Sequence, residues 1–318
     1  MNEFEEYLKK RFEKKEIKTE KDYENELREI EQEIILFGLY KTDLYNNAIF
    51  IGGTALRFIH GLDRYSDDLD FNFLKENKDF NWEKYYENII NNGEKYGCNF
   101  IIKNLTERKK EAEENNESGK EKRIINRIEV RDEGLGIKIK NMDIVPVEWT
   151  KKKAGNYKKT KIVLEASYQY GLIKFIKTER NFLDKYFLNV LNINTLFGGK
   201  INAMLTRKDR QGNDIDEGRD WFDFNWLINK RVEPNFEYLY EKIEKNRNFK
   251  NKNVVRSEEW VKTELYERAK KLNYEKINQD IYEKTTENNY IELNLEKVKE
   301  IINNLGRGGY LIKNNNFN

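Results

Sequence analysis

The chain has 318 residues, of which 38% are hydrophobic and 36% are charged, and its formal net charge is +2. This length allows one large domain or two ordinary ones with a buried core, and the balance of charge excludes a global electrostatic attraction to nucleic acid. A single Cys and a single His exclude a disulfide framework, a cysteine-rich zinc site and a metal site built from histidines.

The N-terminus lacks the apolar core of a secretory signal, and no apolar run approaches the roughly 20 residues of a membrane span. We therefore expect a cytoplasmic protein without a membrane segment. Its chemistry must come from carboxylates, Lys, Arg and backbone amides.

The first hundred residues alternate between helical and strand patterns. Apolar spacing predicts, in chain order, helices over 3–15 and 21–41, a buried strand over 48–51, a short helix over 54–60, a strand over 67–74 and a helix over 82–96.

The stretch from Cys98 to Ser167 is predicted to be rich in strands, with strand character in CNFIIKNL, RIINRIEV, GIKIKNMDIVPVEW and KIVLEAS. The charged run 106–122 favours a hairpin tip or loop over an arm that contacts a partner. The lysine-rich connector 151–161 is either a solvated loop or a contact to phosphates. Beyond about Gly171 the pattern is helical, with amphipathic helices expected over 196–207, 220–229, 236–245, 254–272 and 293–305.

Two glycines follow the strand at 48–51 and open the next helix. Gly52 and Gly53 let a phosphate approach the backbone, and the amides at a helix start favour an anion. The hydroxyl of Thr54 adds a possible hydrogen bond. This pattern predicts a nucleotide-phosphate site, although a Gly-Gly pair alone is more often a simple turn.

Asp68 and Asp70 lie two residues apart on the next strand, so their carboxylates share one face while Leu69 and Phe71 pack on the other. Two adjacent carboxylates repel each other unless a hard cation lies between them. Mg²⁺ prefers one or two carboxylates together with substrate phosphates. Both motifs together therefore predict a site for Mg²⁺, or Mn²⁺, and a nucleoside triphosphate.

The order of these motifs resembles the active-site signature of DNA polymerase β-like nucleotidyltransferases. Gly-Gly-Thr-Ala-Leu at 52–56 and the Arg-x-Ser-x-Asp-x-Asp pattern at 64–70 resemble the AbiEii/AbiGii toxin family, which includes MenT-like toxins. This resemblance covers roughly residues 40–230. It implies an α+β fold with a mixed central sheet and a mostly helical C-terminal lobe. The implied organisation is N-terminal helices over 1–45 packing on the core, a nucleotidyltransferase core over 46–175, and a lobe over 176–318.

The resemblance also implies catalytic residues downstream. It places a phosphate-neutralising lysine at Lys200 and a site carboxylate at Asp220, both in the C-terminal lobe. Asp223 is one helical turn from Asp220, and a structural and a functional role are equally open for it. Both aspartates are candidates for ion pairs with Arg207 or Arg219.

A third carboxylate on a central strand is usual in the superfamily, where it acts as a base or a metal ligand. The candidates are Glu129, Asp143 and Glu165, and the resemblance favours Glu165, with Asp143 as the runner-up.

The segment before the Asp pair carries two further candidates, Arg64 and Ser66, which we place among the nucleotide-binding residues. For Arg64 a structural role is equally open, and Ser66 is also suited to capping the strand. His60 at the end of the short helix is interpreted as structural.

The sequence therefore predicts a toxin-type enzyme that transfers a nucleoside monophosphate from a triphosphate and releases pyrophosphate. The resemblance implies an RNA acceptor, with a tRNA 3′ end preferred, and a cognate antitoxin in a type IV (AbiE-like) toxin–antitoxin or phage-defence system. The alternatives are nucleotide transfer to a protein side chain, phosphoryl transfer like that of a kinase, and nucleotide binding without turnover.

Overall fold

The structure, a computed structural model, describes residues 2–15, 17–75, 77, 79–105, 126–150, 160–168, 174–209, 211–246 and 254–307. Contacts divide the chain into two units, each assembled from three stretches. Unit 1 comprises Met1–Ala55, Ser66–Gln169 and Phe175–Val190, and unit 2 comprises Leu56–Tyr65, Tyr170–Lys174 and Leu191–Asn318. Each unit therefore combines residues that lie far apart in the sequence.

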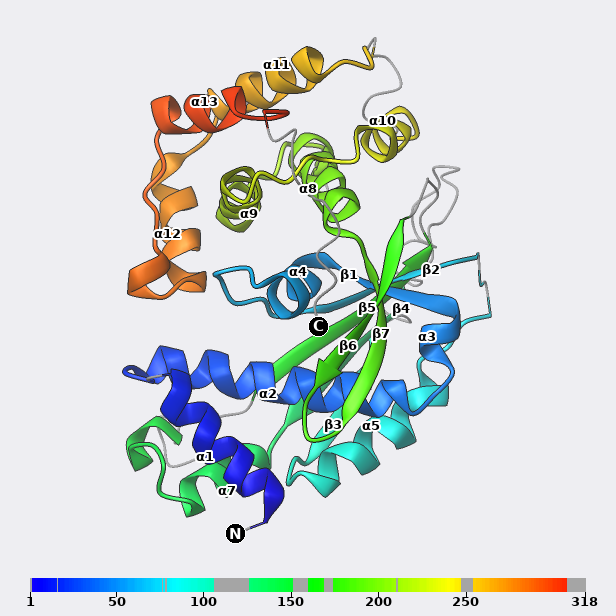
Figure 1. Cartoon of the computed structure of the whole chain (residues 1–318), viewed down its shortest axis with the longest axis vertical. Coiled ribbons are helices and arrows are strands. Elements are labelled where there is room, and N and C mark those ends of the chain that lie inside the picture. Colours follow the sequence, from blue (N-terminus) through cyan, green and yellow to red (C-terminus); the bar gives the residue numbers. More distant parts are fainter. Residues whose placement is uncertain are drawn as a thin grey trace. The chain divides into compact units, whose positions relative to one another are not determined.

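Unit 1 contains a mixed sheet with helices packed on it (Figure 1). Its helices are α1 (Glu3–Lys15), α2 (Glu20–Tyr40), α3 (Leu44–Asn47), the first turn of α4 (Gly52–His60), α5 (Glu83–Lys95) and α7 (Leu135–Asn141), with a 3-10 turn at Val147–Thr150. Its strands are β1 (Ala48–Ile51), β2 (Leu69–Phe73), β3 (Phe100–Asn104), β4 (Asn126–Asp132), β5 (Thr160–Tyr168), β6 (Phe175–Asn181) and β7 (Lys185–Leu191).

Within the described residues the sheet has seven strands in the order β3-β4-β5-β2-β1-β7-β6. β1 is antiparallel to β2 and parallel to β7. β2 is parallel to β5, which is antiparallel to β4. The strands β1 and β2 therefore occupy the interior of the sheet, with the Gly-Gly pair directly after β1 and Asp70 on β2.

The two faces of this sheet differ in polarity because side chains alternate along each strand. The apolar face carries buried side chains such as Phe50 and Phe71, and α2 and α5 cover it. On that face Thr160 hydrogen-bonds Glu31 of α2. The opposite face carries Asp70, Asn72, Arg127, Glu129 and Glu165. Asp70 and Glu165 therefore lie on the same face of the sheet as Arg127 and Glu129.

The helix α2 begins with a capping box, in which Thr19 and Asp22 satisfy each other's backbone amides. Most of its side chains are buried, including four glutamates. Within the described ranges, no helix combines the length and the apolar character that a bilayer crossing requires.

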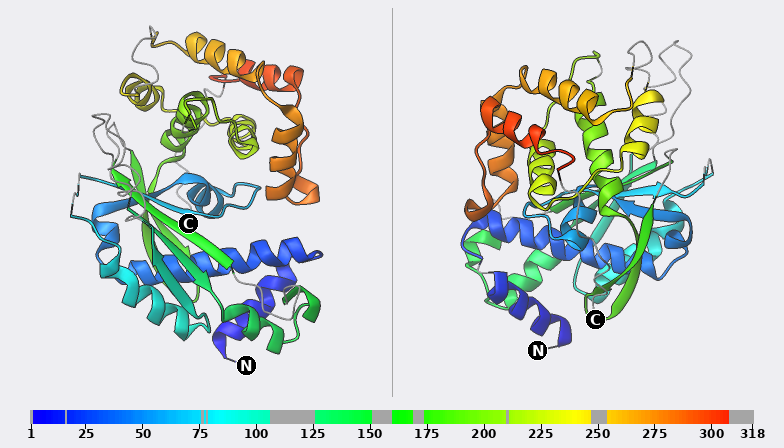
Figure 2. Two further views of the ribbon diagram at one scale, coloured as in Figure 1. Left: turned by 180° about the vertical axis from the view of Figure 1, so that it is seen from behind. Right: turned by 45° about the horizontal axis from the view of Figure 1, so that its top comes forward.

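Unit 2 is helical in its described parts (Figure 2). Its helices are α8 (Ile193–Thr206), α9 (Gly218–Asn229), α10 (Phe236–Glu244), α11 (Glu258–Ala269), α12 (Tyr274–Lys284) and α13 (Leu295–Asn303), with a 3-10 turn at Glu287–Asn289. α8 packs against α9, α10 and α11, and α9 packs against α12. A Cβ on Gly218 would lie 2.2 Å from the carbonyl oxygen of Ile277, so a glycine is required where α9 meets α12.

Residues 135–141 differ from the sequence-based prediction, because they form the helix α7 instead of a strand. The alternating Ile137 and Ile139 indicated a period of two, but Leu135 and Ile139, four residues apart, are the side chains that are fully buried. Asp132 accepts hydrogen bonds from the amides of Gly134 and Leu135 at 3.1 and 2.8 Å, which favours the helix start.

Residues 175–191 also differ, because they form β6 and β7 and not the beginning of a helical lobe. Tyr186, Leu188 and Val190 alternate and are all fully buried, which is the strand pattern that the sequence prediction missed. Unit 1 accordingly extends beyond the expected boundary at 175 and includes the helices over 1–45, while residues 56–65 belong to unit 2. The helix α12 was not predicted either.

Candidate functional site

Gly52 lies at the junction of β1 and α4 and has a φ of +84°, a conformation that favours glycine. A Cβ at this position would lie 2.3 Å from Oδ2 of Asp70. The backbone of the Gly-Gly turn therefore approaches the carboxylate of Asp70 more closely than any other residue type would allow.

The first turn of α4 begins directly at this glycine. The leading amides of a helix have no partner within the helix, so those of Gly53 and Thr54 belong to the group that favours an anion. In unit 1 these amides and the carboxylate of Asp70 lie beside the same glycine.

The Thr54 side chain is fully buried, and its hydroxyl donates a hydrogen bond to the backbone carbonyl of Asp68. This bond uses the single proton of the hydroxyl. The Thr54 side chain therefore fixes the start of the Asp-bearing strand to α4, and any contribution to phosphate binding must come from its backbone amide. This corrects the expectation of a hydroxyl–phosphate hydrogen bond.

The segment that leads into β2 is held by α2. Nε2 of Gln32 donates to the carbonyl of Ser66 at 2.9 Å, and NH1 of Arg28 lies 3.0 Å from Oδ1 of Asp67. Asp68 and Asp70 follow directly, and both are half-buried. Two polar contacts from a buried helix therefore orient the loop that carries the metal-ligand candidates.

Asp70 is flanked by Ile51 of β1 and by Glu165 of β5, which are its Cα partners in the sheet. Side chains of paired residues point to the same face, so Asp70 and Glu165 lie side by side. Leu69 and Phe71 are buried on the opposite face, as the alternation predicted.

Of the three candidates for the third carboxylate, Glu165 is the one in register with Asp70. Its Oε2 accepts a hydrogen bond from Nε of Arg127 at 3.0 Å. Glu129 is on the same face but contacts Arg131 and Lys161, at 2.6 and 2.8 Å.

Asp143 follows α7 and has a φ of 58°, so it does not lie on a strand. No local sequence pattern indicated Arg127 as the partner of Glu165, because the two residues meet only through the pairing of β4 with β5.

The donor set in unit 1 fits a hard divalent cation. Asp68 and Asp70 offer carboxylate oxygens, which suit a hard cation, and the single His of the chain, His60, belongs to unit 2. Among the described residues, no group of three metal-ligating side chains is close enough to form a cage. That arrangement suits Mg²⁺ or Mn²⁺, which bind through one or two carboxylates and complete their coordination with phosphates and water.

The remaining candidates lie in unit 2, where Lys200 of α8 contacts two aspartates of α9. Its Nζ is 2.6 Å from Oδ2 of Asp223 and 3.3 Å from Oδ1 of Asp220. The lysine side chain is 14% exposed and the aspartates are buried. The three-residue spacing of the aspartates thus places both on one face of α9, as expected.

Arg64 has a different environment from the one predicted. It is 2% exposed, and its Nε and NH2 donate to the two oxygens of Asp223 at 2.6 and 2.7 Å. NH1 donates to the carbonyl of Tyr65 at 2.8 Å. With its guanidinium committed within unit 2, Arg64 is left out of the phosphate ligands that we propose.

Asp223 is fully buried, and burial alone would raise its pKa. The charges of Arg64 and Lys200 outweigh this effect and hold the pKa of Asp223 below its usual value. Asp223 is therefore an anion at neutral pH, and its buried charge is matched by two cations.

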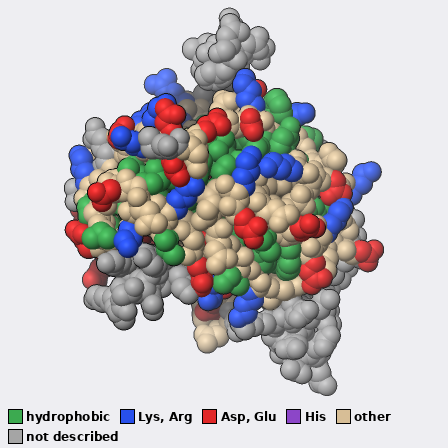
Figure 3. Space-filling model, turned by 90° about the horizontal axis from the view of Figure 1, so that it is seen from below, with side chains coloured by type: hydrophobic (Ala, Val, Ile, Leu, Met, Phe, Trp, Pro, Cys, Tyr) green, Lys and Arg blue, Asp and Glu red, His purple; other side chains and the backbone are tan. Residues whose placement is uncertain are grey.

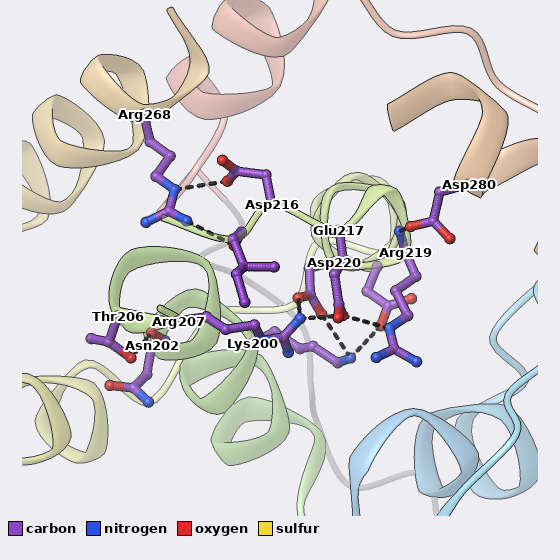
Figure 4. A network of polar contacts seen from close by, with 12 residues as sticks. Lys200, Asn202, Thr206, Arg207, Asp216, Glu217, Arg219, Asp220, Arg268 and Asp280 are labelled. Atoms are coloured by element: carbon purple, nitrogen blue, oxygen red, sulfur yellow. Dashed lines mark hydrogen bonds and ion pairs between the residues drawn. The ribbon is translucent and has the colours of Figure 1, made fainter. Parts of the chain in front are cut away.

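Asp220 is held from the other side by Arg207, whose NH1 is 2.7 Å from Oδ2 (Figure 4). Arg207 also contacts Glu217, to which Arg219 donates at 2.7 Å. The expected ion pair between Asp220 and Arg207 is present, whereas Arg219 pairs with Glu217. Sequence reasoning missed Glu217, because a helix N-cap position gives no sign of its ion pairs.

His60 is consistent with the structural interpretation. Burial lowers its pKa to about 4, so the imidazole is neutral at physiological pH.

The structure thus brings the predicted residues together in two groups. Unit 1 holds Gly52, Gly53, Thr54, Ser66, Asp68, Asp70 and Glu165, and unit 2 holds Arg64, Lys200, Asp220 and Asp223.

Comparison with known proteins identifies the class. The family model described as "Nucleotidyl transferase AbiEii toxin, Type IV TA system" matches residues 34–304. A search of curated proteins gave no match. Similar solved structures include JHP933 from Helicobacter pylori, with 16% identity, a TM-score of 0.41 and coverage of 87% of this chain and 88% of that one. Another is MenT4, a nucleotidyltransferase toxin from Mycobacterium tuberculosis, with 14% identity, a TM-score of 0.40 and coverage of 90% and 94%.

The protein is a nucleotidyltransferase with an α+β fold. It belongs to the AbiEii toxin family of type IV toxin–antitoxin systems. The family confirms the class predicted from the Gly-Gly and Asp-x-Asp motifs, with a nucleoside triphosphate as substrate and a divalent metal as the usual cofactor. The match reaches residue 304, so most of the last ninety residues, which no recognised motif covered, also belong to the family region.

Proposed function

We propose that this toxin transfers a nucleoside monophosphate from a triphosphate to an RNA hydroxyl, with a tRNA 3′ end as the preferred acceptor. The observation that carries the nucleotide site is the approach of Gly52 to Asp70, which places backbone amides beside a carboxylate. Glu165 in register with Asp70 supports a third carboxylate at the same site.

Asp68 and Asp70 would hold Mg²⁺ or Mn²⁺, which supplies charge neutralisation at the phosphates and polarises the α-phosphorus. The amides of Gly53 and Thr54 would bind phosphate oxygens, and the backbone carbonyl of Asp68 stays fixed through Thr54. Lys200 would neutralise the charge that develops on the leaving pyrophosphate.

Glu165 would orient the attacking hydroxyl by accepting its hydrogen bond, while Arg127 fixes the direction of the carboxylate. Asp220 would keep the ammonium group of Lys200 in place on α8. Ser66 remains a candidate nucleotide contact through its hydroxyl.

The RNA acceptor rests on local basic side chains and on the family. Lys103 of β3, Arg131 of β4 and Lys161 of β5 are exposed on the polar face of the sheet, and β5 is also the strand of Glu165. The lysines at 151–153 and 158–159, which we expect to guide RNA, lie outside the described residues, as does the whole of the charged run 106–122. In Figure 3 the coloured basic and acidic side chains are interspersed, in keeping with the net charge of +2. RNA would therefore bind to a limited basic region of the surface and not through the overall charge of the protein.

The test is incubation with α-labelled and γ-labelled nucleotides together with total RNA and total protein. We expect the α-label on RNA, with pyrophosphate released. Label from the γ-position on any acceptor indicates phosphoryl transfer, α-label on protein alone indicates a protein acceptor, and binding without transfer indicates a regulatory module. Each of these three results contradicts the proposal.

A second experiment tests whether the lysines of the connector bind RNA. Replacing Lys151, Lys152, Lys153, Lys158 and Lys159 by Ser should weaken RNA binding and flatten its salt dependence. Nucleotide binding should be retained, because the Gly-Gly turn and the Asp pair are unchanged. Unaltered RNA affinity would remove these lysines from the acceptor site.

A further inference from the structure

Arg268, on α11, is a buried arginine that no motif predicts, with 6% of its surface exposed. Its Nε donates to Oδ1 of Asp216 at 2.7 Å, and its NH2 donates to the carbonyl of Ile215 at 2.8 Å (Figure 4). NH1 is 3.1 Å from Oδ1 of Asp214. One guanidinium therefore binds three consecutive residues just before α9.

The same guanidinium also reaches the end of α8. NH1 is 3.5 Å from the carbonyl of Leu205, one of the last carbonyls of that helix, which have no partner within the helix and favour a cation. Arg268 thus contacts Leu205, directly before the segment 206–217, and residues 214–216 near the end of that segment. The segment connects the helix of Lys200 to the helix of Asp220.

This connecting segment carries the side chains that hold Asp220. Arg207, its second residue, lies 2.7 Å from Oδ2 of Asp220 and also contacts Glu217, its last residue. The backbone amide of Ile215 donates to the carbonyl of Arg207 at 3.2 Å. Any displacement of Ile215 is therefore passed to Arg207 and then to the carboxylate that contacts Lys200.

We propose that Arg268 is a positioning residue for nucleotidyl transfer: it fixes the segment 206–217 so that Arg207 holds Asp220 and Asp220 holds the ammonium group of Lys200. The inference rests on the proposed function of Lys200. In the part of the chain that the structure describes, Arg268 contacts only other protein groups. It therefore acts on the reaction through this chain of contacts.

The test compares Arg268→Lys with Arg256→Lys. Arg256 binds Glu244 through two hydrogen bonds in the same unit but is 51% exposed and lies outside the network, so it is the matched control. Lysine keeps the charge of Arg268 but cannot contact Asp216, Ile215 and Leu205 together. We expect kcat to fall about tenfold or more, with KM for the triphosphate within about twofold, and no change for Arg256→Lys.

A double-mutant cycle with Arg207→Lys separates positioning from general destabilisation. If Arg268 acts through Arg207, the fold-loss of kcat in the double variant should be smaller than the product of the fold-losses in the two single variants. Losses that multiply, or a lowered melting temperature with unchanged kcat at a temperature where the variant is folded, would overturn the inference.

A second readout does not depend on activity. The rate at which an amine-reactive reagent labels Lys200, followed by mass spectrometry, should increase severalfold in Arg268→Lys and stay constant in Arg256→Lys. An unchanged rate refutes the inference. Wild-type protein that transfers no nucleotide while the labelling responds as expected would refute the proposed function and leave the positioning of Lys200 by Arg268 supported.

Discussion

Gly52 has its α-carbon so close to Asp70 that an added methyl group would lie 2.3 Å from the Asp70 carboxylate oxygen. The glycine therefore serves two purposes at once. It takes a positive φ, and it leaves space for the carboxylate of the neighbouring strand.

These two purposes can be separated by Gly52→Ala and Gly61→Ala. Gly61 has a φ of +74°, and a Cβ there would meet nothing within 4 Å. Gly61→Ala should cost only the backbone strain of about 1 kcal/mol. Gly52→Ala should cost more and reduce transfer on the order of a hundredfold, because Asp70 must move. Melting temperatures and transfer rates check this, and equal effects of the two variants would argue against the close approach.

Asp70→Asn should abolish transfer and cellular toxicity while the protein remains folded. The amide keeps the shape beside Gly52 but removes the charge that a divalent cation requires, so a loss of about a thousandfold or more is expected. Asp67→Asn is the control, because it also removes a carboxylate, three residues before Asp70, but this carboxylate pairs with Arg28. The measurements are transfer rate, toxicity and circular dichroism. A folded Asp70→Asn enzyme with near wild-type activity would exclude the metal role of Asp70.

Lys200→Met should lose most of the activity, about a hundredfold or more, with a small change in melting temperature. The methionine keeps the packing of the aliphatic part, and Asp223 retains Arg64 while Asp220 retains Arg207.

Arg64→Met is the informative contrast. It leaves the fully buried Asp223 without its main partner, which should destabilise the protein by about 3–5 kcal/mol. If Arg64→Met left the melting temperature unchanged but raised KM for the triphosphate, Arg64 would be a nucleotide ligand after all.

Glu31 on α2 gives a prediction on pH. Burial, with the nearby charge of Asp132 adding to it, raises the pKa of Glu31 well above its usual value. The folded protein therefore keeps a proton that the unfolded chain loses near the ordinary glutamate pKa. It follows that this group lowers stability as the pH rises above that value.

Glu31→Gln should accordingly raise the melting temperature at pH 8, by about 2 °C or more, and leave it almost unchanged at pH 4. Glutamine has the shape of the protonated acid and cannot titrate. Melting curves across this pH range test the prediction, and a variant that is less stable at pH 8 than at pH 4 relative to wild type would contradict it.

The sequence was sufficient for elements whose signal is local. The strand at Ala48–Ile51 and the helix at Glu3–Lys15 have the predicted bounds, because apolar periodicity and the following residues define them. The burial of Leu69 and Phe71 on either side of Asp70 also follows from alternation alone, although β2 begins at Leu69 and Asp68 therefore precedes the strand.

The partners of these residues could not be predicted from local pattern. The ion pair of Arg127 with Glu165 depends on the register of β4 and β5, and that of Arg64 with Asp223 joins residues 159 positions apart. Arg64 lies beside the Asp-x-Asp motif, and this position indicated a nucleotide ligand. In the structure Arg64 is buried and forms an ion pair with Asp223. The helix α7 shows the same limit. Ile137 and Ile139 alternate as in a strand, and only the packing of the folded chain shows that these residues form a helix.

Each unit is assembled from three stretches of chain, and β7, which pairs with β1, is encoded more than a hundred residues after it. A chain that stops before β7 has made both motifs of the nucleotide site but lacks the strand on one side of the Gly-Gly turn. Premature stop codons and frameshifts that fall before the codons for β7 should therefore all give harmless products. A ribosome must translate past Leu191 before β7 can pair with β1 and complete the sheet that supports the site. Toxicity therefore appears late during synthesis.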